Sequence, residues 1–412
     1  MKLSKTPPDP KGLTSTDDHD RPTGPGDVAR NRIVGARVAE ARQAMGLPVA
    51  YLANILGVTR QTVYAYESGS LTIPPDRLAK LASVLDQPLG FFESAAVEWT
   101  FDPRALHFRD TKDRDQRARA ATRLKWLQEY FGFLLSSVEV PALSLPELDP
   151  PGDPTSISSG FIEAAAASVR AHWKLGLEPV PNVIRAMERH GIVVGFVALN
   201  IDDLDGVSCW SERYGRPFVL LNSDKASAAR SRFDAAHELG HIVLHRNVPT
   251  ELIELRRPRD DATTSARPPL SPIYKLMEQQ AHDFARAFLM PAETWGREGV
   301  PVSLTRYKNL KARWLVSISA MLFRARDLGL ADKERLTMLR RQLTNAGWKK
   351  WEPYDDLVPQ ERPQMFRQAT ELLVEHGVEV AEVFPRRLHD LESLAGVDPE
   401  RLTAPAKLVT LN

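Results

Sequence analysis

The sequence predicts a multidomain α+β protein, with an all-α N-terminal region, an α+β domain in the middle and a mostly helical C-terminal region. Two observations lead to this prediction. The chain has 412 residues, which is more than one ordinary hydrophobic core requires. Its local patterns also change along the chain, from short amphipathic helices to strand-like apolar runs and then back to helices.

Changes in composition set the predicted boundaries. Residues 1–30 contain five prolines and almost no large apolar side chains, so we expect a disordered tail. The proline-rich stretch VPALSLPELDPPGDP, from Val140 to Pro154, marks a domain boundary. The predicted segments are a tail at 1–30, a helical unit at 31–95, a helical linker at 96–150, an α+β domain at 151–300 and a mostly helical C-terminal region at 301–412.

Charge and cysteine content narrow the class of protein. Lys and Arg number 54 and Asp and Glu number 53, so the net charge of +1 indicates no polyanionic partner by itself. The single cysteine, Cys209, excludes an internal disulfide framework and a metal cluster built from cysteines. No apolar run is long enough to span a membrane. We therefore expect a cytoplasmic protein that has no membrane partner.

Residues 31–92 have the pattern of short helices joined by turns. In the stretch YLANILGVTRQTVYAYESG, from Tyr51 to Gly69, one helix ends at Gly57 and a second begins after Thr59, whose hydroxyl can cap it. This is the arrangement of a helix-turn-helix. A small helical module that binds protein would give the same spacing.

This segment, including its end LAKLASVLDQPLGFF, resembles the XRE family of lambda-repressor-like DNA-binding domains. The resemblance implies a double-stranded DNA operator as partner, bound by a homodimer, with the second helix in the major groove. Val49 stands where the family usually has Gln. The implied DNA-binding residues are Arg60, Gln61 and Ala65 at base-reading positions, Thr62 at a phosphate and Tyr64 beside them. The basic stretch from Lys112 to Lys125 can add phosphate contacts, although such runs are usually solvated helix faces.

The stretch AAHELGHIVLH, from Ala235 to His245, carries the strongest chemical signal in the chain. On a helix, His237 and His241 share a face and can bind one zinc ion, with Glu238 beside them as a base. His245 lies about 12 Å along the axis from His237, so both cannot bind the same ion on an unbroken helix.

A catalytic zinc ion needs a third protein ligand from elsewhere. The stretch EQQAHDFARAFLMP, from Glu278 to Pro291, offers Glu278 and, one turn later, His282. We favour Glu278 as the ligand and leave His282 as the alternative.

Together, the two stretches resemble the paired motifs of the ImmA/IrrE family of zinc endopeptidase-like proteins, over about residues 155–295. The resemblance implies a zincin-like α+β domain in which His237, His241 and Glu278 bind Zn²⁺ and Glu238 is the catalytic base. His245 and His282 are then candidates for supporting the ligands, and His282 stands where the family usually has Asn. Tyr214, Tyr307 and His282 are candidates for stabilising an oxyanion.

These observations predict a DNA-binding transcriptional regulator of bacterial or phage type with a zinc-dependent endopeptidase domain. The resemblance implies that it cleaves a specific regulatory protein, for example one encoded by an adjacent gene. Two alternatives remain open: a non-enzymatic transcription factor that senses a ligand or metal, and an antitoxin-like binding module. Glu238 favours the enzyme, because a purely structural zinc site has no use for a base.

Overall fold

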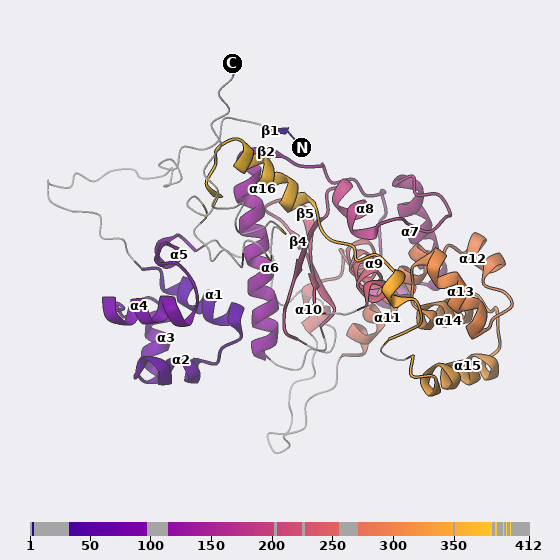
Figure 1. The fold of residues 1–412 in the computed structure, drawn as a ribbon, viewed down its shortest axis with the longest axis horizontal. Helices are drawn as coiled ribbons and strands as arrows, with labels where there is room; N and C mark the ends of the chain where they lie inside the picture. Colours follow the sequence, from indigo (N-terminus) through magenta and orange to yellow (C-terminus); the bar gives the residue numbers. More distant parts are fainter. Residues whose placement is uncertain are drawn as a thin grey trace. The chain divides into compact units, whose positions relative to one another are not determined.

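Contacts in the computed structural model divide the chain into two compact units (Figure 1). Unit 1 combines the N-terminal residues with residues 112–140 and those from Gln364 onward, and unit 2 contains residues 141–363. The structure describes residues 33–96, 114–201, 204–224, 227–254, 271–348 and 351–380, together with Lys2, Leu3, Phe384, Asp390, Ser393 and Gly396. Apart from Lys2 and Leu3, the predicted tail lies outside the described residues. Over the described residues, no helix has the length and apolarity to cross a membrane.

A bundle of short helices forms the first part of unit 1. These helices are α1 (Gly35–Met45), α2 (Val49–Leu56), α3 (Arg60–Glu67), α4 (Pro75–Val84) and α5 (Leu89–Glu93). Val38, Leu52, Val63 and Leu81 are fully buried and come from four of the helices, so they form a shared core. The turn between α2 and α3 is built as predicted: Gly57 ends α2 at a φ of 64°, and Thr59 caps α3 by accepting a hydrogen bond from the Thr62 amide at 3.1 Å.

Helix α6 (Arg114–Leu135) completes unit 1. It packs against α1 and against α16 (Met365–Glu375), which lies beside it in Figure 1. The hydroxyls of Tyr130 on α6 and Thr370 on α16 are 2.6 Å apart in a buried hydrogen bond. Strands β1 (Lys2–Leu3) and β2 (Val138–Glu139) form a short antiparallel pair. Helix α16, near the C-terminus, thus packs with a helix from the N-terminal half of the chain.

Two basic side chains of α6 are buried in ion pairs within unit 1. Lys125 pairs with Glu40 of α1, and Arg123 pairs with Asp390. These two cations are therefore held by carboxylates and are not offered to DNA phosphates. The reason is that acidic residues far away in the sequence fold against this face of the helix.

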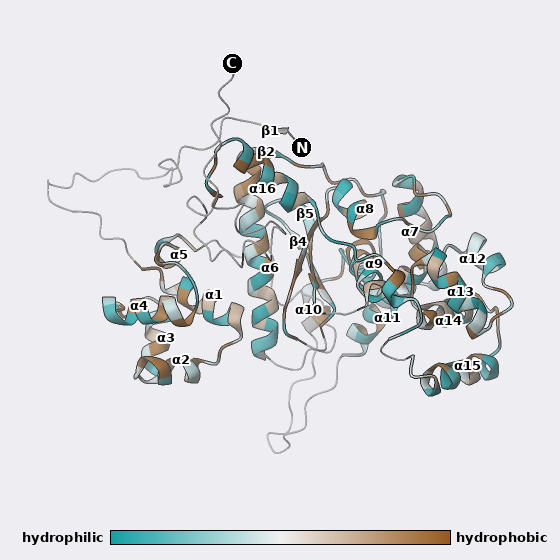
Figure 2. Ribbon diagram, in the orientation of Figure 1, coloured by the Kyte–Doolittle hydropathy of each residue, from teal (hydrophilic) through white to brown (hydrophobic). Residues whose placement is uncertain are grey.

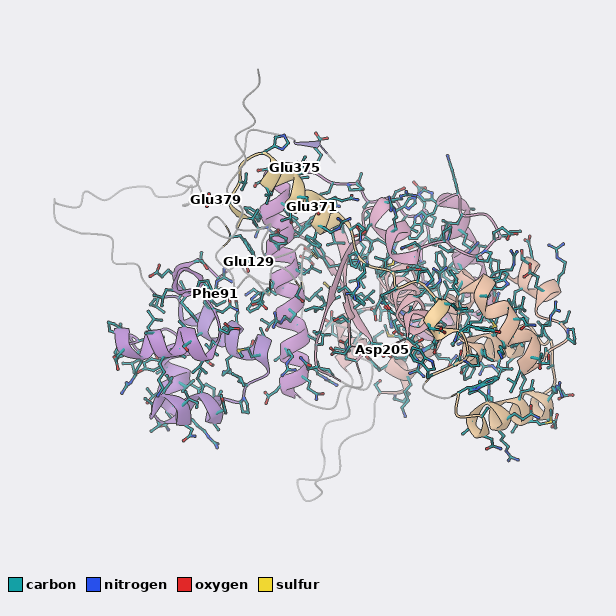
Figure 3. All side chains as sticks on the ribbon, in the orientation of Figure 1. Phe91, Glu129, Asp205, Glu371, Glu375 and Glu379 are labelled. Atoms are coloured by element: carbon teal, nitrogen blue, oxygen red, sulfur yellow. The ribbon has the colours of Figure 1, made fainter. Side chains whose placement is uncertain are left out.

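A third buried cation, Arg37, joins α1 to α6. Its guanidinium lies 2.6 Å from the carboxylate of Glu129 and 5.2 Å from the ring centre of Phe91, two residues that are labelled in Figure 3. The ion pair and the cation–π contact together compensate for burial of the charge.

Unit 2 is built on a small mixed sheet. Its strands are β3 (Val193–Val197), β4 (Gly206–Ser211) and β5 (Arg216–Asn222), in the order β3-β5-β4. β3 is parallel to β5, and β4 is antiparallel to it. The strands match the strand-like runs that the sequence predicts, which are GIVVGFVAL from Gly191, GVSCW from Gly206 and PFVLLN from Pro217, except that β4 and β5 are each one residue longer than their run. Figure 2 shows apolar colouring along β5, the central strand, which is buried on both faces.

Nine helices are described in unit 2: α7 (Ser159–His172), α8 (Val183–Arg189), α9 (Ala228–Leu244), α10 (Thr250–Glu254), α11 (Pro272–Leu289), α12 (Ala292–Glu298), α13 (Leu304–Trp314), α14 (Ile318–Asp327) and α15 (Lys333–Asn345). Helix α9 packs on β4 and β5, α11 packs on α9, and α7 packs on α11. The rings of Trp295 and Trp314 meet edge to face at 5.3 Å in the same core. Helices beyond residue 300 therefore share the core of the sheet.

After α15, residues 351–363, called here the C-terminal loop, carry carboxylates into unit 2. Glu352 and Asp355 lie 2.8 and 2.7 Å from the ammonium of Lys311, which is fully buried on α13. Glu352 also accepts a hydrogen bond from the Ile318 amide at the start of α14, and Asp355 accepts one from Ser227 before α9. The loop therefore joins three helices by buried polar contacts.

Another carboxylate of the C-terminal loop, Glu361, reaches α8 and α9. It accepts hydrogen bonds from the amides of Val183 and Ile184 at 2.7 and 3.0 Å, and it forms a buried ion pair with Arg232 on α9. Burial lowers the pKa of Arg232, and the Glu361 carboxylate opposes that shift. Glu361 thus supplies the counter-charge of this buried guanidinium.

Replacing Glu361 by Gln should lower the free energy of unfolding by about 3–5 kcal/mol, because it leaves the Arg232 guanidinium buried without its counter-charge. Urea unfolding followed by tryptophan fluorescence measures this change. The matched control is Glu178→Gln, since Glu178 pairs with Arg313 at an exposed site and should contribute at most about 1 kcal/mol. Equal effects of the two substitutions would contradict the role given to Glu361.

Candidate metal centre and DNA-binding helix

The close approach of α9 and α11 builds the centre. Gly240, inside the HELGH stretch, faces α11 so closely that a Cβ atom there would lie 3.1 Å from both the Cα and the carbonyl oxygen of Ala281. Glycine, which has no Cβ atom, allows the two backbones to approach in this way without pushing them apart. The close contact brings Glu278, three residues before Ala281, opposite the two histidines that flank Gly240.

The donor atoms of His237, His241 and Glu278 all lie within 4.8 Å of one another. The two Nε2 atoms are 3.1 Å apart. The Glu278 carboxylate places Oε2 at 3.4 Å from His237 Nε2 and Oε1 at 3.3 Å from His241 Nε2. Both histidines are buried, and Glu278 is nearly so. Two helices thus bring two imidazoles and one carboxylate to a single point.

These residues fit a zinc ion. A tetrahedral zinc ion with bonds of about 2.0–2.1 Å sets its ligand atoms about 3.3–3.4 Å apart, which is close to the distance between the two Nε2 atoms and to the distance of each Nε2 from its nearer Glu278 oxygen. Within the described part of the chain, the buried Glu278 Oε2 has no hydrogen bond. A buried carboxylate oxygen normally has a hydrogen-bond donor or a cation beside it. The donor set and the spacing therefore suit a small divalent cation that prefers nitrogen and oxygen ligands.

The electrostatics of the three donors also favour a cation. Burial favours the neutral acid, but the close contacts with the His237 and His241 rings outweigh it and lower the pKa of Glu278 well below its usual value. For His237, burial favours the neutral ring, yet the contact with Glu278 raises its pKa. The Glu278 carboxylate is therefore negatively charged, and it favours positive charge at the neighbouring donor atoms.

Glu238 is not part of the donor set and contacts β4. Its Oε2 accepts a hydrogen bond of 2.6 Å from the Ser208 hydroxyl. Gly206, two residues earlier on the strand, leaves room for the carboxylate, because a Cβ atom there would lie 3.0 Å from Glu238 Oε1. Burial raises the pKa of Glu238, while His241, His237 and Ser208 oppose that shift. Sequence reasoning missed Ser208, whose only signal was a hydroxyl in the apolar run GVSCW.

The other two histidines lie beside the ligand set. His245 ends α9, and its Nδ1 is 3.0 Å from Nδ1 of His241, on the far side of that ring from the donor point. His282 Nδ1 contacts the Glu278 carbonyl oxygen at 2.6 Å, and its ring centre is 4.4 Å from that of His237. The group of converging donor atoms includes neither ring. Both rings therefore contact residues of the donor set from outside it.

The two tyrosines considered for an oxyanion have other contacts. Tyr307 is fully buried on α13, and its hydroxyl donates to the Gly299 carbonyl at 3.0 Å. The ring of Tyr214, in the turn between β4 and β5, lies 5.7 Å from that of Phe218. Of the three candidates, His282 has a ring contact with a residue of the donor set, His237.

In unit 1, α3 presents the residues that the helix-turn-helix pattern singled out. Arg60 and Gln61 are exposed at the start of the helix, and Tyr64, one turn later, is 58% exposed. Thr62 and Ala65 are half-buried between them. Tyr51 on α2 is also exposed, at 47%, and sequence reasoning did not single it out. The exposed polar and aromatic side chains of α3 are not packed in the core of unit 1, so they are available to contact another molecule.

A helix-turn-helix in one unit and a buried His-Glu-x-x-His helix in the other are the parts of a DNA-binding regulator that carries a metallopeptidase-like domain. Family models agree. Residues 38–92 match the helix-turn-helix model, and residues 187–326 match the IrrE N-terminal-like domain of the M78 peptidase family. No curated protein matches the chain significantly. The second match extends past the predicted boundary at 300, through α13 and most of α14.

Gly240→Ala should weaken zinc binding, because the added methyl group forces α9 and α11 apart by a few tenths of an ångström and spreads the donor atoms. It should also destabilise unit 2 by about 1–3 kcal/mol through overpacking. Competition with a chromophoric chelator and urea unfolding measure the two effects. The matched control is Gly296→Ala on α12, where a Cβ atom has no neighbour within 4 Å and alanine should be neutral or stabilising. Equal zinc affinity in the two variants would contradict the account.

Proposed function

We propose that this protein is an operator-binding regulator of the cytoplasm whose second unit is a zinc-dependent endopeptidase that cleaves a specific regulatory protein. One observation carries the peptidase proposal. Three metal-binding side chains converge on one point, and a fourth, Glu238, lies beside them but is held out of the donor set by Ser208. Three ligands and a separate base are what a hydrolytic zinc site requires.

His237 and His241 would hold zinc through Nε2, and Glu278 through its carboxylate. When bound, zinc supplies Lewis acidity, which polarises a peptide carbonyl and acidifies water. Glu238 accepts a proton from the attacking water and passes it to the leaving amine. The Ser208 hydroxyl occupies Glu238 Oε2, so the proton is carried on Oε1, where Gly206 leaves space.

Burial of Glu238 supports its role as a base. Its raised pKa brings it closer to neutral pH, and the efficiency of a general base increases as its pKa approaches the working pH. A site that only sensed metal would need the three ligands but would gain nothing from a buried carboxylate beside them. Ser208 adds to this argument, because its hydrogen bond fixes the carboxylate in one orientation.

Glu238→Gln should retain zinc and lose cleavage. Glutamine keeps the size of the side chain and can still accept from Ser208, but it cannot accept the proton of water. We expect one zinc per chain and a loss of about 10²- to 10⁴-fold in the cleavage rate. The experiment expresses each variant with the protein encoded by the adjacent gene, and mass analysis then identifies fragments.

Two further variants complete that experiment. His241→Ala should lose both zinc and cleavage, and the surface control Glu178→Gln should keep both. Three results together would favour a metal sensor over a peptidase. The parent would bind zinc but cut no partner, Glu238→Gln would regulate the promoter as well as the parent does, and His241→Ala would not.

We propose further that α3 binds the major groove of the operator. Arg60 and Gln61 can form bidentate hydrogen bonds with guanine and adenine, Thr62 can contact a phosphate, and Tyr64 and Ala65 face the same groove. The exposure of Arg60, Gln61 and Tyr64 supports this assignment. Two copies bound to half-sites about one helical turn apart are expected for this kind of domain.

Arg60→Ala and Gln61→Ala should each weaken operator binding by about 1–3 kcal/mol and relax the preference at one base pair. Fluorescence anisotropy with operator and single-substitution duplexes, at fixed salt, measures both effects. The charge-matched control is Arg185→Ala, on an exposed position of α8 in unit 2. Unchanged affinity and base preference in both variants would exclude α3 as the reading helix.

A further inference from the structure

The side chain of Gln280 on α11 is buried, and its orientation is fixed. Its amide nitrogen donates to the carbonyl oxygens of Pro154 and Ile157 at 2.8 and 3.2 Å. A backbone carbonyl can only accept, so the amide nitrogen must face these two groups. The amide oxygen, Oε1, therefore points the other way, toward His245.

The direction of the next hydrogen bonds follows from this orientation. Gln280 Oε1 lies 3.0 Å from His245 Nε2 and can only accept, so Nε2 carries the hydrogen. His245 is buried, which favours its neutral ring with a single N–H. Its Nδ1 is then an acceptor, 3.0 Å from Nδ1 of His241. His241 must donate from Nδ1, which leaves its Nε2 without a hydrogen and directed at the donor point shared with His237 and Glu278.

We propose that Gln280 and His245 form a hydrogen-bond relay, anchored on the carbonyls of Pro154 and Ile157, that sets the tautomer and ring orientation of His241 for zinc binding. The inference rests on the proposed zinc site and deepens it. A metal-bound histidine usually donates its other ring N–H to a carbonyl or carboxylate, and this partner tunes the affinity of the site. Here a second histidine takes the place of that acceptor.

The relay serves one of the two histidines. Among the described residues, Nδ1 of His237 is buried and has no hydrogen-bond partner. His241 is thus the ligand whose lone pair the protein prepares in advance. The hydrogen bonds of Gln280 to Pro154 and Ile157 connect the candidate centre to residues outside 187–326, the range that matches the peptidase family model. Pro154 belongs to the short 3-10 helix η2 (Pro154–Ser156).

The test measures Zn²⁺ affinity of the full chain by chelator competition. Gln280→Met keeps the shape of the side chain but removes the acceptor for His245, and His245→Leu removes the acceptor for His241. Each should weaken Zn²⁺ binding by about 10- to 100-fold. His245→Asn places an amide oxygen near the position of Nδ1, so it should restore affinity to within a few-fold of the parent. The matched control is Gln279→Met, since Gln279 bonds only to Asp283 at an exposed site and should leave Zn²⁺ affinity unchanged.

Two readouts separate a positioning role from a merely structural one. The double variant His245→Leu with Gln280→Met should bind Zn²⁺ no more weakly than His245→Leu alone, because the two residues act in series. A long-range proton–nitrogen spectrum of the metal-free, histidine-labelled chain should also show His241 protonated on Nδ1 in the parent and on a mixture of nitrogens in Gln280→Met.

Each outcome bears on one of the two proposals. Parental Zn²⁺ affinity in both Gln280→Met and His245→Leu, or additive losses in the double variant, would overturn the relay. If His245→Leu does not fold, Gln280→Met still tests the same chain with His245 in place. A parent that folds but binds no Zn²⁺ would instead overturn the proposed zinc site, and with it the proposed peptidase.

Discussion

The contact between α9 and α11 at Gly240 is the constraint on which the candidate centre depends. A Cβ atom at this position would press against the backbone of Ala281, so glycine lets the helices approach closely and brings Glu278 opposite both histidines. Helix α9 also packs on β4 and β5. That packing brings Glu238 to the hydroxyl of Ser208. One close helix contact therefore positions the three candidate ligands, and one helix–sheet contact positions the candidate base.

Buried ion pairs also hold α9 in place. Arg232, five residues before His237, is tied to Glu361 of the C-terminal loop, and Lys311 is tied to Glu352 and Asp355 of the same loop. A buried ion pair adds little net stability over an apolar core, but leaving one partner unpaired is costly. The packing of α8, α9, α13 and α14 therefore depends on the carboxylates of the C-terminal loop. This loop runs directly into α16, whose residues belong to unit 1.

The parts of this structure that sequence could predict are those with a local pattern. The i, i+4 spacing of His237 and His241 needs only a helix, the Gly57 turn and Thr59 cap need only neighbouring residues, and the three strands show as apolar runs. What sequence did not predict depends on partners far along the chain. Ser208 is 30 residues from Glu238, Gln280 is 35 from His245, and Glu361 is 129 from Arg232. The basic stretch ending at Lys125 shows the same limit, because its acidic partners Glu40 and Asp390 become neighbours only in the folded unit.

The most direct measurement of the central claim, that two helices bring two imidazoles and one carboxylate to a single zinc ion, is the X-ray absorption spectrum at the zinc edge of the zinc-loaded full chain. The account predicts an inner coordination sphere of nitrogen and oxygen atoms only, at about 2.0–2.1 Å, with the multiple-scattering pattern of two imidazole rings. Sulfur at about 2.3 Å, which only Cys209 or a methionine could supply, would contradict it, as would a sphere of oxygen atoms without imidazole.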